Sequence, residues 1–143
     1  MSELKGLIPA AGRGIRLYPN TELIPKPLLK IDGIPILKRN IELMRDALGI
    51  NEIYILVGYK KEKIIGEFKY GDHLGVKIKY IEVHDVEKGL AEGILLAKDY
   101  LTDIFCIILG DEVYYHSNHN EMLKLLDKDF SVACAIKEVN HPH

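Results

Sequence analysis

Apolar, strand-like runs alternate with helix-like patterns along the sequence, and this alternation limits the fold more than any other feature. Strands whose apolar residues are continuous and separated by helices are typical of a parallel sheet covered on both faces. We therefore expect an α/β fold, a three-layer sandwich with a mostly parallel sheet. The run over 104–109 (IFCIIL) is predicted to be a fully buried strand. The predicted strands cover 4–10, 52–57, 76–83, 104–109 and 130–137, and the predicted helices cover 35–48, 60–68, 88–101 and 118–127.

Length, charge and cysteine content narrow the class of protein. A chain of 143 residues fits one domain, over residues 1–143. Its 19 Lys and Arg against 21 Asp and Glu give a net charge of -2, which disfavours a nucleic-acid partner. Cys106 and Cys134 lie in apolar runs without metal-binding spacing, so both are predicted to be buried, reduced thiols. With no leader-like start and no apolar run of membrane-spanning length, we expect a cytoplasmic protein without a membrane partner.

The segment from Ala10 to Gly33 has no clear element, and it directly follows the first predicted strand. Ligands bind at the carboxyl ends of strands in parallel sheets, and long loops in compact domains are usually functional. Small residues and two glycines let backbone N–H groups approach a phosphate, and Arg13 and Arg16 supply positive charge. The spacing matches neither a Walker A motif nor a dinucleotide fingerprint. A tight turn with solvated arginines is the alternative.

Two further segments carry side chains suited to phosphates. Lys26 lies between two prolines that restrict the backbone, which is typical of an anion clamp or of an exposed proline turn. Asp111 follows the predicted strand over 104–109, where it could hold Mg²⁺ or cap a turn. The segment 88–93 has Gly89 and Ala91 at a helix start, leaving room for a flat group or for close helix packing. The histidines lack zinc-site spacing.

Together these motifs resemble the N-terminal half of the sugar-1-phosphate nucleotidylyltransferases, near the glucose-1-phosphate thymidylyltransferase and uridylyltransferase branch. The family's glycine loop, its Pro-Lys pair, its Gly-Leu-Ala segment and its Leu-Gly-Asp-Asn segment occur here in the same order. The fold implied by the resemblance is Rossmann-like and of the GT-A-like nucleotidyltransferase type, with its C-terminal part missing. The matching segments are Pro9-Ala10-Ala11-Gly12-Arg13-Gly14-Ile15-Arg16-Leu17-Tyr18-Pro19-Asn20-Thr21, Pro25-Lys26-Pro27, Gly89-Leu90-Ala91 and Leu109-Gly110-Asp111-Glu112.

The resemblance implies a reaction in which a nucleoside triphosphate, with dTTP or UTP favoured, and a sugar 1-phosphate give a nucleotide sugar and pyrophosphate. It implies that Arg16 grips the leaving pyrophosphate, that Lys26 contacts the phosphates at the scissile bond, and that Asp111 binds the catalytic Mg²⁺. Such in-line transfer at the α-phosphate depends on positioning and charge, without a covalent intermediate. The residues implied to lie against the nucleotide are Ala10, Ala11, Gly12, Arg13, Gly14, His84 and Gly89.

The sequence departs from the family pattern at several places. Ile15 replaces a Thr of the phosphate loop, Glu112 replaces an Asn beside the metal aspartate, and His84 stands where many members have a Gln that reads the pyrimidine. Family members also continue well beyond the equivalent of residue 143, with segments that bind the sugar phosphate. A nucleotide-binding module or a regulatory subunit without turnover is therefore the alternative to an enzyme. An exposed final strand would also favour a homo-oligomer.

Overall fold

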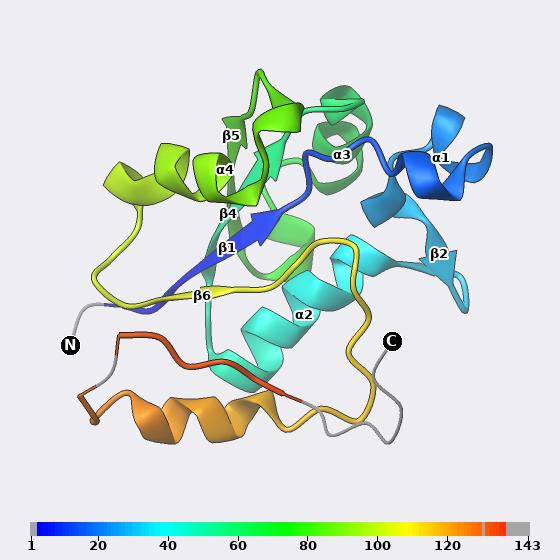
Figure 1. The fold of residues 1–143 in the computed structure, drawn as a ribbon. Helices are drawn as coiled ribbons and strands as arrows, with labels where there is room; N and C mark the ends of the chain where they lie inside the picture. Colours follow the sequence, from blue (N-terminus) through cyan, green and yellow to red (C-terminus); the bar gives the residue numbers. More distant parts are fainter. Residues whose placement is uncertain (1–2, 130, 137–143) are drawn as a thin grey trace.

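The computed structural model describes residues 3–129 and 131–136. Its main sheet has four strands, all parallel, in the order β5-β4-β1-β6 (Figure 1). The first strand of the chain is central, and its Leu7 pairs with Tyr54 on one side and with Ile107 on the other. Since the strands are parallel, their carboxyl ends meet at one edge. The strands are β1 (Lys5–Pro9), β4 (Glu52–Val57), β5 (Lys77–Glu82) and β6 (Phe105–Ile107).

Helices cover both faces of the sheet, which confirms the expected three-layer α/β fold. Alternate residues of β1 point to opposite faces: Ile8 belongs to the apolar cluster with α2 and α3, and Leu7 belongs to the cluster with α4. In Figure 1, α4 lies on one side of β1 and α2 on the other. None of the helices in the described ranges is long and apolar enough to cross a membrane. The helices are α2 (Ile36–Leu48), α3 (Lys61–Phe68) and α4 (Leu90–Ala97).

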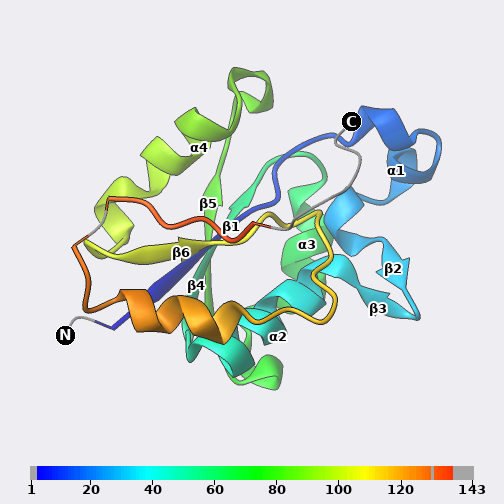
Figure 2. The same ribbon diagram turned by 60° about the horizontal axis from the view of Figure 1, so that its bottom comes forward.

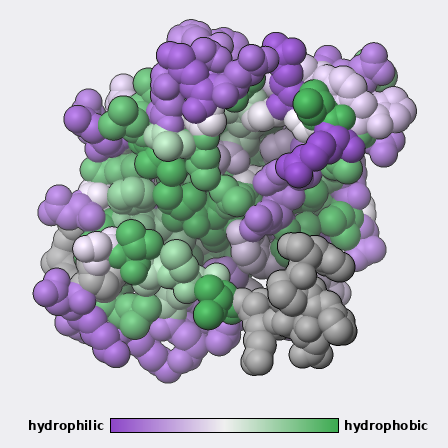
Figure 3. Space-filling model, viewed as in Figure 1, coloured by the Kyte–Doolittle hydropathy of each residue, from purple (hydrophilic) through white to green (hydrophobic). Residues whose placement is uncertain are grey.

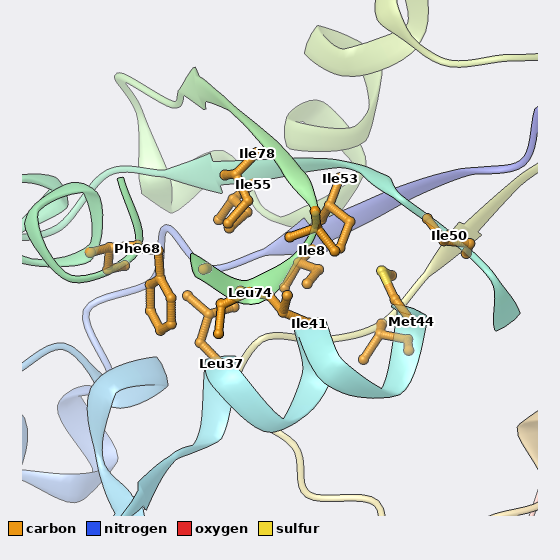
Figure 4. Close-up of a cluster of buried hydrophobic side chains, with 14 of the residues drawn as sticks. Ile8, Leu37, Ile41, Met44, Ile50, Ile53, Ile55, Phe68, Leu74 and Ile78 are labelled. Carbon is orange, nitrogen blue, oxygen red and sulfur yellow. The ribbon is translucent and has the colours of Figure 1, made fainter. Parts of the chain in front are cut away.

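The larger core lies between α2 and the sheet (Figure 4). In this core, α2 contributes Leu37, Ile41 and Met44, which recur at the spacing of one helix face and are completely buried. The helix ends at Gly49, whose φ of 65° is a left-handed conformation that glycine adopts without strain. The predicted helix over 35–48 is therefore confirmed to within one residue, because its apolar stripe is what the core requires.

The segment between β1 and α2 is irregular, as expected, but it contains several single turns. A two-stranded antiparallel hairpin closes it just before α2. This hairpin projects from the sheet in Figure 1. The elements are η1 (Ile15–Leu17), α1 (Asn20–Leu23), η2 (Lys26–Leu28), β2 (Lys30–Ile31) and β3 (Ile34–Pro35).

The later part of the chain differs from the prediction in its helices. The predicted helix over 88–101 is shorter: η4 (Val86–Lys88) precedes α4, and η5 (Lys98–Tyr100) follows it. Gly89 causes the late start, because its φ of 88° and ψ of 179° are not helical. The predicted helix over 118–127 is a 3-10 helix, η6 (His119–Leu125), which lies beside α2 (Figure 2). A further single turn, η3 (Asp72–Leu74), precedes β5.

The two C-terminal strand predictions need correction. The run over 104–109 is a strand only over β6, and it is not fully buried, because β6 pairs on one side only within the described residues and Ile107 is 38% exposed. Figure 3 shows apolar side chains at the surface of this face, between α4 and β6. Residues 131–136 form no strand, because they pair with no neighbouring strand, while residues 130 and 137 lie outside the described ranges.

The prediction of two buried thiols is half wrong. Cys106 is partly buried in β6, and burial raises the pKa of its thiol to about 11. Cys134 is exposed, since its segment does not join the sheet. Neither cysteine forms a disulfide.

Candidate active site

A cavity of about 390 Å³ opens at the carboxyl edge of the sheet. The end of β1 contributes its floor, the loop after β1 and η2 contribute one wall, and α4 with the segment before it contributes another. Eight of the ten residues that the sequence singled out line it. These eight are Ala10, Ala11, Gly12, Gly14, Arg16, Lys26, Gly89 and Asp111.

Backbone hydrogen bonds hold the glycine loop at the end of β1. Ala10 N–H donates to the Leu56 carbonyl at 2.9 Å, so the loop leaves the sheet in register with β4. Gly14 has a φ of 64°, and a Cβ added there would lie 3.2 Å from the side chains of Lys26 and Thr21. A Cβ added to Gly12 would meet nothing within 4 Å. The folded chain thus leaves open space at Gly12, where a ligand can approach the backbone.

Two residues that were not predicted as site residues hold this loop in place by hydrogen bonds. Thr21 is completely buried, and its hydroxyl donates to the Gly14 carbonyl at 2.7 Å. Tyr59 N–H donates to the Ala11 carbonyl at 3.0 Å, and its hydroxyl lies 3.0 Å from the Glu22 carbonyl. Loss of solvent contact and the neighbouring Tyr18 raise the pKa of the Tyr59 hydroxyl. Thr21 belongs to the glycine-loop segment that matches the family, but the residue pattern alone does not show that its partner is a backbone carbonyl, and Tyr59 belongs to none of the motifs.

Lys26 and Asp111 meet across the cavity. Lys26 Nζ donates to Asp111 Oδ2 at 2.7 Å, and both side chains keep partial solvent contact, at 27% and 40% exposure. Ion pairs with this much exposure contribute only about 0–1 kcal/mol to folding stability. Stability alone therefore does not account for bringing a lysine and a carboxylate together in a cavity, and the pair is suited to binding a charged ligand.

The turn that carries Asp111 is packed against the end of β1. Gly110 N–H donates to the Pro9 carbonyl at 3.0 Å, and a Cβ added to Gly110 would lie 2.8 Å from that carbonyl oxygen. The next residue, Glu112, is not among the cavity-lining residues, and its Oε2 accepts a hydrogen bond from Tyr114 at 2.8 Å. Among the residues that the structure describes, Asp111 is the one that brings a carboxylate into the cavity lining.

The opposite wall of the cavity is apolar. Leu56, Val83 and Val86 line it, together with small residues of α4 and of the segment before it. Gly93 allows this approach, since a Cβ there would lie 2.9 Å from a Leu56 methyl group. The strand order in the sheet places this wall beside β4 and β5 and the Asp111 turn beside β6, on opposite sides of β1. The cavity can therefore hold a flat apolar ring at one end and an anionic group at the other.

Two of the ten candidate residues lie outside the cavity lining. Arg13 is exposed at the surface of the loop. The side chain of His84 is 84% exposed, and its Nδ1 lies 3.7 Å from a carboxylate oxygen of Glu82. Neither is brought to the ligand space in this structure.

The side chains of the cavity fit a magnesium ion that is coordinated partly by the protein and partly by a bound substrate. Within residues 3–129 and 131–136, no group of three or more His, Cys, Asp or Glu residues is gathered to hold a metal ion. Mg²⁺ commonly binds through one or two carboxylates and completes its octahedron with phosphate oxygens and water. Asp111, at the lip of the cavity, offers one such carboxylate.

Comparison with protein families identifies the chain. A family described as nucleotidyl transferase matches residues 5–143. The chain belongs to this family. It is 40% identical over 139 residues to the bifunctional protein GlmU of Methanocaldococcus jannaschii, which covers 97% of the chain and 31% of that protein. It is 34% identical to the UTP–glucose-1-phosphate uridylyltransferase AglF of Haloferax volcanii, over 94% of the chain and 54% of that protein.

Solved structures of nucleotidyl transferases share the fold. A provisionally assigned glucose-1-phosphate thymidylyltransferase from Bacillus anthracis superposes with a TM-score of 0.78 at 26% identity, over 85% of this chain and 49% of that one. A UDP-glucose pyrophosphorylase complexed with UDP-glucose gives a TM-score of 0.69 at 26% identity, over 87% and 52%. The chain thus spans about a third to about a half of the length of these relatives.

Proposed function

We propose that the chain forms the nucleotide-binding part of a sugar-1-phosphate nucleotidylyltransferase. The reaction joins a nucleoside triphosphate to a sugar 1-phosphate and releases pyrophosphate. The observation that carries this proposal is the Lys26–Asp111 pair inside a cavity walled by the glycine loop. The names of the relatives, which include a uridylyltransferase and a thymidylyltransferase, support UTP or dTTP as the nucleotide.

The proposed binding mode follows the two ends of the cavity. The pyrimidine ring lies against the apolar wall near Gly89, and the triphosphate lies along the backbone of Ala11 and Gly12. Arg16 binds the pyrophosphate that leaves, and Lys26 binds oxygens of the α-phosphate. His84 and Arg13 contribute little in this arrangement, because they lie outside the lining.

The proposed chemistry is in-line displacement at the α-phosphorus by an oxygen of the sugar phosphate. Negative charge on the equatorial oxygens and on the leaving pyrophosphate must be balanced, and Lys26 and Arg16 supply positive charge at those places. Asp111 would hold Mg²⁺, and the bound ion would supply further charge neutralisation at the phosphates. Ile15 has no hydroxyl to donate, so the backbone N–H groups of the loop carry that side of the phosphate site.

Binding and turnover are tested separately. Isothermal titration with UTP, dTTP, CTP and GTP in MgCl₂ should give binding of a pyrimidine triphosphate. Asp111→Asn should weaken it, while Asp99→Asn, at an exposed position outside the cavity, should not. Pyrophosphate release with glucose 1-phosphate then distinguishes an enzyme from a binding module. Failure of every triphosphate to bind the unmodified protein would refute the proposed function.

A further inference from the structure

The first two turns of α2 contact both segments that carry the charged pair of the cavity. Ile36 N–H donates to the Leu29 carbonyl at 3.0 Å, directly after η2, which contains Lys26. One helical turn later, Asn40 Nδ2 donates to the Leu109 carbonyl at 2.9 Å and to the Glu112 carbonyl at 3.1 Å. Residues four apart lie on the same face of a helix. One rigid helix turn therefore fixes the backbone on both sides of the Lys26–Asp111 contact.

Asn40 binds the two ends of the turn that presents Asp111. Glu112 N–H also donates to the Leu109 carbonyl, at 3.3 Å, so residues 109–112 form a turn with Asp111 at its third position. Both hydrogens of the Asn40 amide are used by the carbonyls that bracket Gly110 and Asp111. Rotation of this turn would require breaking at least one of the two bonds.

Helix stability gives no reason for an asparagine at this position. Asn40 is 1% exposed on a face that otherwise buries Leu37, Ile41 and Met44. Asparagine is a poor helix former, and burying an amide is costly unless it is hydrogen-bonded. An apolar residue would satisfy the core, whereas only a side-chain donor can join both carbonyls of the turn to α2.

We propose that Asn40 is the positioning residue of the site: it holds the 109–112 turn so that the Asp111 carboxylate faces Lys26 and the metal-bound triphosphate. This inference rests on the proposed function, since it assigns Asn40 a part in the metal dependence of nucleotide binding. Asn40 touches neither the cavity nor a ligand and acts only through the turn. Residues that orient a metal ligand without touching the metal typically change metal affinity by about 10–100-fold when they are removed.

The hydrogen bonds are tested on the unmodified protein by NMR. The Asn40 side-chain amide should exchange its protons with solvent much more slowly than that of Asn51, which is exposed. Equal exchange rates for the two side chains would overturn the proposal, and no variant has to fold for this test.

The role is tested by titrating UTP in MgCl₂ and in EDTA. Asn40→Leu, which keeps the branched shape but is larger and has no donor, and Asn40→Ala should each lower the affinity in MgCl₂ by about tenfold and keep the affinity in EDTA within about twofold. Ile41→Val, a truncation at the neighbouring buried position, should keep both values. An unchanged Mg²⁺ effect in the Asn40 variants would overturn the positioning role. If the unmodified protein binds no triphosphate, the proposed function itself fails, and the positioning role fails with it.

Discussion

Lys26 Nζ and Asp111 Oδ2 lie 2.7 Å apart although 85 residues separate them in the chain. The contact joins the loop after β1 to the turn after β6, two strands that are neighbours in the sheet. A lysine that faces the cavity and has one acidic partner can exchange that partner for a phosphate oxygen without losing a charged contact.

Lys26→Met should therefore impair binding and leave stability nearly unchanged. Hydrogen bonds to charged groups contribute about 1.5–3 kcal/mol, so affinity for the triphosphate should fall by about tenfold or more. The free energy of unfolding should change by less than about 1 kcal/mol, because the pair is partly exposed. Lys30→Met, at an exposed lysine outside the cavity, is the matched control. Calorimetric titration and urea unfolding measure the two quantities, and equal affinities for both variants would contradict the prediction.

Thr21 should matter through its hydroxyl. Thr21→Val keeps the shape of the side chain but removes the hydroxyl hydrogen bond to the Gly14 carbonyl, which keeps the Leu17 N–H as its other donor, so the loss should be about 0.5–1.5 kcal/mol of unfolding free energy. Thr21→Ser retains the donor and removes one methyl group, with a cost of about 0.8 kcal/mol. Urea unfolding of both variants shows which of the two is less stable. A serine variant that is less stable than the valine variant would show that packing outweighs the hydrogen bond.

Two glycines respond oppositely to alanine. In Gly110→Ala the new Cβ would lie 2.8 Å from the Pro9 carbonyl oxygen, so the turn must shift, at a cost of about 1–3 kcal/mol, and nucleotide affinity should fall with it. In Gly66→Ala the new Cβ meets nothing within 4 Å inside α3, so stability should rise by about 0.5–1 kcal/mol. Thermal unfolding measures the change in melting temperature of each variant. Equal melting temperatures for the two variants would contradict the prediction.

Glu52 should make folding sensitive to acid. Hydrogen bonds from Tyr54 and then from Lys79 lower the pKa of its carboxyl from the ordinary value of 4.5 to about 2. Because the folded pKa lies below the unfolded one, this stabilisation is complete above pH 4.5 and is lost as the pH falls toward 2. The stability gap between the unmodified protein and Glu52→Gln should thus shrink over that range. Urea unfolding at several pH values tests this, with Glu67→Gln on the exposed face of α3 as the control.

The two thiols should react at different rates. Cys134 is exposed, whereas the thiol of Cys106 is partly buried and has its pKa raised to about 11 by burial. Since the thiolate is the reactive form, a disulfide reagent at pH 8 should modify one cysteine quickly and the other slowly. Cys134→Ser should remove the fast phase. Two equally fast thiols in the folded protein would contradict the placement of Cys106.

The sequence predicted those parts of the fold that depend on local periodicity. The helix over 35–48 and the strand over 52–57 are confirmed nearly residue for residue, because their patterns match the faces they bury. The strand over 130–137 is wrong across residues 131–136, since an apolar run forms a strand only where a neighbour offers hydrogen bonds. For the same reason β6, with one strand neighbour in the described structure, is less buried than its composition indicates.

Most of the cavity could also be predicted, because small residues and charges directly after parallel strands must gather at one edge. The positions of His84 and Arg13 could not be predicted in this way, because both residues are exposed in loops whose local conformation decides where the side chain lies. Thr21 stands in the segment that matches the family, but its bond to a backbone carbonyl, like those of Tyr59, could not be predicted from the pattern of side chains. Asn40 did leave a signal: it is the polar residue on an otherwise apolar helix stripe.

The position of β1 in the sheet also sets an order for synthesis. Within this chain β1 is flanked by β4 on one side and by β6 on the other, so both of its neighbours are translated after it. Pairing with β4 can begin once residue 57 has emerged, but the cavity needs the turn at residue 111. The residues of β1, α2 and β4 are thus all synthesised before the turn that completes the charged pair. Ligand binding therefore has to wait until the turn at residue 111 has been synthesised and has met the loop after β1.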